Sequence, residues 1–170
     1  MPTYKLNGGS AVEVKARSSI HDTTTRWETV SGTVTADAET LAETGASAAI
    51  AVDMTAFDAG DWLKNRKLKK DLDVANHPRA EFELFALTDV VRAEDGSFSA
   101  KAAGVLRWRG REASVEATGS GRFDGDRLEA TAKFDLDVTT LGVKPPKVLM
   151  FKVEPVVSVE VRVVGVVSGA

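Results

Sequence analysis

The sequence predicts an all-β protein, an eight-stranded antiparallel barrel with one short helical insertion near residues 57–74. Eight segments alternate apolar and polar residues with a period of two, which is typical of strands with one buried and one exposed face. The alternation is interrupted once, before Pro78, and then resumes. The 170 residues fit a single domain, residues 1–170. A closed barrel leaves no unpaired edge strand, which favours it over the alternative, a sandwich of two sheets.

The strands are expected where this alternation is bounded by turn-forming residues. The eight segments are residues 11–18, 30–37, 47–55, 80–86, 97–108, 112–119, 128–138 and 157–163. The seventh is the most regular, because every second residue from Leu128 to Val138 is apolar. Asp-Gly-Asp at 124–126 is one of the turn signals that separate neighbouring strands.

The insertion at 57–74 is expected to be a helix. Asp58 or Asp61 is a suitable N-terminal cap, and Lys69 and Lys70 are cations suited to the C-terminal end of the helix dipole. His77 precedes a proline and is expected to be extended, so the helix ends before it.

The inner face of the predicted barrel is rich in small residues. Of its 35 apolar-face positions, fourteen are Ala or Gly, namely Ala16, Gly32, Ala36, Ala48, Ala80, Ala86, Ala100, Ala102, Gly104, Ala113, Ala117, Gly119, Ala130 and Ala132. An eight-stranded barrel has room either for a packed interior or for one small ligand. So many small residues favour an elongated apolar pocket over an interior filled by its own side chains, although the filled interior remains an alternative.

We therefore predict a ligand site formed by the larger inner-face residues and by the insertion. The candidate ligand-binding residues are Val14, Val34, Ile50, Val52, Leu63, Arg66, Leu68, Phe82, Leu84, Phe98, Leu106, Trp108, Phe134, Leu136 and Val159. Arg66 or His21 at an end of the barrel is expected to orient a polar head group. The other interpretation of Arg66 is a solvated residue on a helix face.

Catalysis is not expected. Ser19, His21 and Asp22 are adjacent, but triads are assembled by geometry, and no nucleophile-elbow motif accompanies these residues. A metal held by His21 and His77 with an aspartate is also disfavoured, because no HxH, HxxxH or cysteine ligand supports it. We expect neither a metal nor a cofactor.

The charge and the apolar segments of the sequence limit the kinds of partner and the cellular location that we expect. A net charge of -3 argues against nucleic acid, and no apolar run is long enough for a transmembrane segment. The N-terminus lacks a signal peptide, so a cytoplasmic location is expected, or a periplasmic one if the chain is a processed form. Phe85 and Leu87 on the wet face of the fourth strand suggest a partner surface and a homodimer.

The chain also resembles a known family, the YceI-like polyisoprenoid-binding proteins, over residues 4–165. The matching residues are Arg66, Leu68, Pro78 and Phe82 around the insertion, Gly104, Leu106, Gly110 and Val115 in a hairpin, and the segment Phe134–Val143. The resemblance implies a lipocalin-like barrel that holds long apolar molecules in its lumen. The sequence departs from the family pattern at Lys67, Leu72 and Val74.

The function expected from these observations is noncatalytic binding, storage or transport of a long apolar molecule, such as an isoprenoid, a quinone or a fatty-acyl lipid. Two alternatives remain. One is an enzyme for a hydrophobic substrate that uses His21 with Asp22 or Ser19, and the other is a ligand-free stress-response or interaction barrel.

Overall fold

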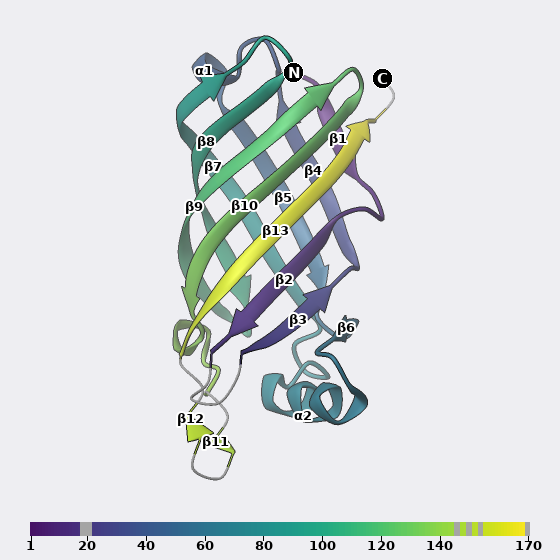
Figure 1. Ribbon diagram of the computed structural model, residues 1–170, viewed down its shortest axis with the longest axis vertical. Helices are drawn as coiled ribbons and strands as arrows, with labels where there is room; N and C mark the ends of the chain where they lie inside the picture. The colour runs from purple at the N-terminus through teal and green to yellow at the C-terminus, as the bar shows by residue number, and fades with distance from the viewer. Residues whose placement is uncertain (18–21, 145–146, 149–150, 153–154, 169–170) are drawn as a thin grey trace.

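The computed structural model is a closed antiparallel barrel of eight strand positions, with α1 at one end and α2 at the other (Figure 1). It describes residues 1–17, 22–144, 147–148, 151–152 and 155–168. The elements are β1 (Thr3–Leu6), β2 (Ala11–Ala16), β3 (Thr23–Trp27), β4 (Val30–Ala36), α1 (Leu41–Thr44), β5 (Ala46–Asp53), β6 (Phe57–Asp58), α2 (Trp62–Leu72), β7 (Arg79–Arg92), β8 (Ser97–Trp108), β9 (Arg111–Asp124), β10 (Arg127–Asp137), the 3-10 helix η1 (Val138–Leu141), β11 (Lys147–Val148), β12 (Phe151–Lys152) and β13 (Val156–Val167). The predicted barrel with one helical insertion is confirmed, and the sandwich alternative is wrong.

Two of the eight positions are each occupied by two short strands. β13 pairs with β2 and then with β1, while β3 and β4 pair with β2 and β1 respectively. The alternation in the sequence predicted β2 and β4 but missed β1 and β3. These two strands have only four and five residues, and β3 is mostly threonine, so neither shows a long apolar face.

Ser10 completes the wall of the barrel at the break between β1 and β2. Its side chain is 1% exposed. The hydroxyl accepts a hydrogen bond from the Val164 amide at 2.9 Å and donates one to the Val164 carbonyl at 3.2 Å. The hydroxyl thus gives the Val164 amide the acceptor that a neighbouring strand would otherwise supply, while the Val164 carbonyl also accepts from the Asn7 amide at 2.9 Å. The backbone groups of β13 therefore stay paired where the first strand is interrupted.

The helix of the insertion, α2, is capped at both ends, by Asp61 at its start and by Asp73 at its end. The Asp61 carboxylate accepts a hydrogen bond from the Lys64 amide at 2.8 Å, and Asp73 ends α2 with a left-handed φ of 52°. The predicted range was too long at its start, because Phe57 and Asp58 pair with β3 as the short strand β6.

β7 contains an irregularity that shifts its inner face. The register with β8 changes between Leu84 and Ala86. Beyond it, Leu87 faces the barrel interior, whereas Phe85 and Ala86 are exposed. The prediction that Ala86 faces inward and Leu87 outward was therefore wrong, since strict alternation does not allow for a bulge.

Two apolar clusters occupy the two halves of the barrel. The first, nearer α2, contains Trp27, Leu72, Trp108 and Leu141. The second, in the other half, includes Tyr4 with other side chains of β1, β4, β5 and β10. The candidate site lies in the lumen that these clusters border.

Substitution Ser10→Ala is expected to lower the free energy of unfolding by about 1–3 kcal/mol, because the buried Val164 amide loses its acceptor. Urea denaturation measures this change. Ser31→Ala, on the exposed face of β4, is the matched control and is expected to change stability by no more than about 0.5 kcal/mol. Equal effects of the two substitutions would contradict the role of Ser10.

Tyr4 is expected to make the barrel sensitive to alkaline pH. Burial raises the pKa of the Tyr4 phenol above its ordinary value of about 10, and Asp37 and Asp126 raise it further. The folded state then holds this proton more tightly than the unfolded state. The resulting stability is complete below pH about 10 and is lost as the pH rises through the folded-state pKa.

The variant Tyr4→Phe lacks this titration. Its free energy of unfolding is therefore expected to fall less steeply than that of the wild type above pH about 10. Denaturation curves over a series of alkaline pH values test the difference. Parallel pH dependence in the two proteins would show that Tyr4 does not contribute.

Candidate ligand-binding cavity

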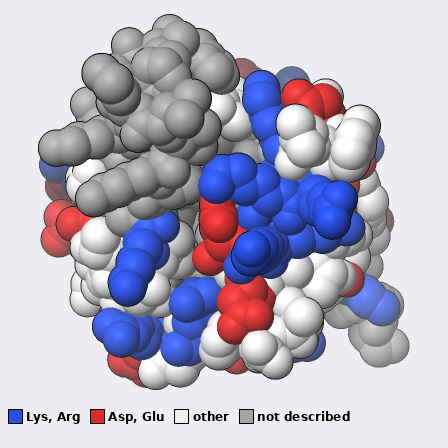
Figure 2. Space-filling view, turned by 90° about the horizontal axis from the view of Figure 1, so that it is seen from below, with Lys and Arg blue, Asp and Glu red and all other residues white. Residues whose placement is uncertain are grey.

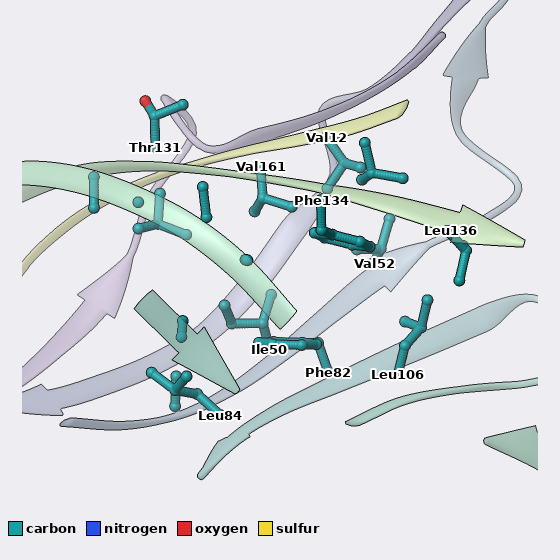
Figure 3. Close-up of a pocket in the computed structure, with 18 of the residues that line it drawn as sticks. Val12, Ile50, Val52, Phe82, Leu84, Leu106, Thr131, Phe134, Leu136 and Val161 are labelled. Carbon is teal, nitrogen blue, oxygen red and sulfur yellow. The ribbon is translucent and has the colours of Figure 1, made fainter. Parts of the chain in front are cut away.

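A cavity of about 340 Å³ lies in the lumen of the barrel. Side chains from all eight strand positions line it, together with residues of α1, α2 and η1. Figure 3 shows part of this lining, in which Ile50, Phe82 and Phe134 extend from different strands into one space. The interior is therefore not filled by its own side chains, contrary to the packed alternative.

Small residues on three neighbouring strands explain why the lumen is hollow. Across β8, β9 and β10, Ala100 pairs with Gly119, which pairs with Ala132, and Ala102 pairs with Ala117. All five line the cavity. This part of the wall has no long side chain to extend inward, so the space in front of it remains open.

Two phenylalanines that could have filled the lumen lie against its wall instead. A Cβ atom added at Gly104 would lie 2.7 Å from Cζ of Phe82, and one added at Gly121 would lie 2.8 Å from Cζ of Phe98. Each ring occupies the place of a missing side chain, which is how aromatic residues commonly cover glycines in barrels. The glycines thus keep both rings close to the backbone.

The lining is almost entirely apolar. As far as the structure describes the chain, the lining contains no charged side chain, and its hydroxyl groups belong to Thr25, Ser120 and Thr131. The indole N–H of Trp27 donates to the Met54 carbonyl at 3.4 Å, and that of Trp108 to the His77 carbonyl at 2.9 Å. A ligand in contact with the described lining meets no ionic partner there, so it is expected to be apolar along most of its length.

Short segments close the lumen at both ends. At one end Leu41 of α1 is 1% exposed and lines the cavity. At the other, Leu68 and Leu72 of α2 project inward, and Leu141 and Val143 lie on the same lining. The closures are made by apolar side chains from outside the strands.

Beside η1, the backbone hydrogen bonding between two neighbouring strands of the barrel wall ends. Pairing between β9 and β10 stops at Thr118 and Lys133, although both strands continue toward the α2 end. Beyond this point Leu141 and Val143 are 2% and 5% exposed. Side-chain packing replaces the hydrogen-bonded ladder along this seam.

Arg109 connects the two closures at the α2 end. Its guanidinium donates to the Leu72 carbonyl at 2.6 Å and to the Gly142 carbonyl at 3.5 Å, and it lies 5.5 Å from the Trp108 ring centre. Arg109 and Gly110 form the turn between β8 and β9, with φ values of 59° and 71°. One side chain thus holds the last turn of α2 beside the segment that follows η1.

Thirteen of the fifteen predicted site residues line the cavity, and two do not. The thirteen are Val14, Val34, Ile50, Val52, Leu68, Phe82, Leu84, Phe98, Leu106, Trp108, Phe134, Leu136 and Val159. Leu63 is 62% exposed and Arg66 is exposed. Because each helical residue turns by about 100°, both lie on the side of α2 opposite Leu68, so placing them at the site was wrong. Contact of the thirteen with a ligand remains a prediction.

The sequence argument missed lining residues outside the eight predicted strands. Leu41 and Leu141 belong to short helices that have no measurable periodicity. Thr25 lies on β3, in the segment TTTRW, where Thr25 and Trp27 are buried and Thr24 and Arg26 are exposed. This alternation of buried and exposed residues indicates a strand. It was missed because one of the two buried residues, Thr25, is polar.

The residues considered for catalysis do not form a described site. Ser19 and His21 lie outside the described residues, and Asp22 is exposed. His77 lies 3.9 Å from Asp73 without lining the cavity. Within the described ranges, no group of three or more potential ligands could hold a metal ion, and no helix is both long and apolar enough to cross a membrane.

The variant Arg109→Met is expected to loosen both closures while preserving much of the side-chain volume. Hydrogen exchange at the amides of Asp73 and Val143 is expected to accelerate roughly tenfold, since a hydrogen bond to a charged group contributes about 1.5–3 kcal/mol. Arg107→Met is the control, because Arg107 pairs with carboxylates on the barrel exterior. Unchanged exchange in Arg109→Met, or equal acceleration in the control, contradicts the connection.

Comparison with known proteins agrees with this geometry. The model of a YceI-like domain matches residues 4–165. BcnA from Burkholderia cenocepacia superposes with a TM-score of 0.75 at 19% identity, covering 94% of this chain and 98% of BcnA. A polyisoprenoid binding domain from Saccharophagus degradans gives 0.75 at 12% identity, covering 99% and 100%. The YCEI protein of Campylobacter jejuni gives 0.66 at 8% identity, covering 85% of each chain. No curated protein matches the chain.

Proposed function

Because this chain belongs to the YceI-like family, we propose that its barrel binds a long apolar molecule without catalysing a reaction on it. The classes that fit are isoprenoids, quinones and fatty-acyl lipids, and binding would serve storage or transport. The similar domain from Saccharophagus degradans is described as polyisoprenoid binding, which supports an isoprenoid as the first candidate.

The observation that carries the proposal is a lumen of about 340 Å³ whose described lining residues are all uncharged. Empty apolar volume in a protein costs about 24 cal/mol per Å³, so an unfilled lumen of this size costs on the order of several kcal/mol. A hydrocarbon chain fills it and gains about 0.8 kcal/mol for each CH₂ group removed from water. Both terms favour an elongated apolar ligand.

A polar head group would lie at an end of the lumen. Arg66 cannot orient it there, because it lies on the outer side of α2. Thr25 is 5% exposed and lines the cavity, so its hydroxyl offers a polar contact within the lining. This hydroxyl suits a small neutral head group, and His21, the other residue predicted to orient a head group, lies outside the described residues.

The lining supports binding rather than catalysis. Among the described residues it contains no Asp, Glu, His, Lys or Arg, and the whole chain has no Cys. General acid–base catalysis needs a titratable group within hydrogen-bond reach of the reacting atoms. The described part of the lining offers a ligand burial and shape but no such group.

The proposal is tested by mass spectrometry of an organic extract of the purified protein, and by uptake of added farnesol. We expect a co-purified apolar lipid, or saturable uptake by the delipidated protein. Repeated absence of both would overturn the proposal.

A lumen-filling variant locates the site. Ala132→Phe extends a ring into the cavity and is expected to abolish binding of the apolar probe N-phenyl-1-naphthylamine. Binding is measured as the increase in probe fluorescence when the protein is added. Lys133→Phe adds the same ring on the exposed side of the same strand and should leave probe binding unchanged. Circular dichroism establishes that both variants fold. Probe binding that survives in Ala132→Phe would place the ligand elsewhere.

A cytoplasmic location and a homodimer remain predictions. Phe85 is 55% exposed, whereas Leu87 lines the lumen. The partner surface suggested by this pair is therefore reduced to one aromatic side chain.

A further inference from the structure

One side of α2 presents exposed apolar and cationic side chains together. This outer face consists of Trp62, Leu63, Arg66, Lys69 and Lys70, which follow the i, i+3, i+4, i+7 spacing of one helix side. All five are exposed, and the exposed fractions of Trp62 and Leu63 are 71% and 62%. Leu68 and Leu72 on the opposite side pack into the barrel, so the outer face does not contribute to the apolar core.

The charge of α2 is opposite to that of the whole chain. The chain has a net charge of -3, yet Figure 2 shows Lys and Arg side chains gathered over the α2 end. The cations of α2 are Lys64, Arg66, Lys67, Lys69 and Lys70, and its one carboxylate is Asp71. The described residues at the end of the barrel that α2 closes therefore present cations that can attract an anionic surface.

Nearby carboxylates do not neutralise the outer face. Asp61 lies 4.0 Å from Lys64, and Asp71 lies 3.3 Å from Lys67. Within the part of the chain that the structure describes, Arg66, Lys69 and Lys70 have no carboxylate within 4.0 Å, so their charges are available to a partner.

We propose that the outer face of α2 docks the barrel onto an anionic phospholipid bilayer. Trp62 and Leu63 enter the headgroup region, where tryptophan is favoured because its ring is apolar and its N–H is polar. The cations face the lipid phosphates, and each contributes about a fivefold increase in partitioning near such a surface.

A bilayer fits this face better than other anionic partners. The apolar part consists of two adjacent residues at the start of the helix, beside cations that continue along it. A bilayer interface offers both an apolar layer for the first and anionic phosphates for the second. Docking in this orientation places the Leu68 and Leu72 end of the lumen next to the membrane. The proposal does not require that the lumen hold a ligand.

Sedimentation with vesicles tests the proposal. We expect the full chain to bind vesicles of phosphatidylcholine mixed with phosphatidylglycerol, to bind phosphatidylcholine alone much more weakly, and to be released by salt. The double variant Lys69→Gln and Lys70→Gln is expected to bind roughly 30-fold more weakly. The matched control is Lys5→Gln with Lys133→Gln, which removes the same charge from exposed positions on the barrel wall and should bind as the wild type does.

Fluorescence locates the contact. Trp27 and Trp108 are 5% and 7% exposed, so quenching by brominated lipids reports mainly on Trp62. We expect quenching on anionic vesicles and its loss in Trp62→Phe. Absence of anionic vesicle binding, equal loss in the control double variant, or an unquenched Trp62 would each overturn the proposal.

Two further measurements separate this proposal from others. The lumen-filled Ala132→Phe protein is expected to bind vesicles as the wild type does, and loss of that binding would show that lipid uptake rather than docking had been measured.

Sedimentation velocity reveals whether the outer face instead contacts a second copy. A wild-type dimer that becomes a monomer in Lys69→Gln and Lys70→Gln, without vesicle binding, would identify that occupant and overturn the bilayer.

Discussion

The structure depends on the pairing of β13 along both of its edges. One edge pairs with β10, and the other pairs with β2 and β1, so the first and last strands close the sheet into a barrel. At the break in the first strand the Ser10 hydroxyl accepts from the Val164 amide, and the Val164 carbonyl accepts from both the Asn7 amide and the Ser10 hydroxyl. Closure joins the inner faces of all eight strand positions into one lumen, and the candidate ligand-binding cavity lies in that lumen.

Closure also creates a conflict between stability and room for a ligand. A sheet curved into a barrel brings its inner side chains together, and larger residues at Ala100, Ala117 or Ala132 would fill the space. The chain instead has small residues there and gathers its larger apolar groups in two clusters, one around Trp108 and Leu72 and the other around Tyr4. The side chains are therefore less closely packed around the cavity than in the two apolar clusters.

Much of the barrel could be predicted from the sequence, because a period of two specifies which side chains face inward. Thirteen of the fifteen predicted residues line the lumen for this reason. Leu63 and Arg66 were misplaced because an 11-residue helix with leucines on two sides does not show which side faces the barrel. Leu87 was misplaced by a bulge, and Leu41 and Leu141 were missed because isolated apolar residues in short helices carry no pattern.

The turn between β8 and β9 is an example of local frustration. A left-handed backbone disfavours residues with a Cβ atom, and Asn or Gly suits such a position better than Arg109, whose φ is 59°. The contacts of its guanidinium with Leu72 and Gly142 offset this cost. Optimising the turn in isolation, with glycine at both of its central positions, would therefore act against the closures. In this hairpin the best local sequence and the best global sequence are different.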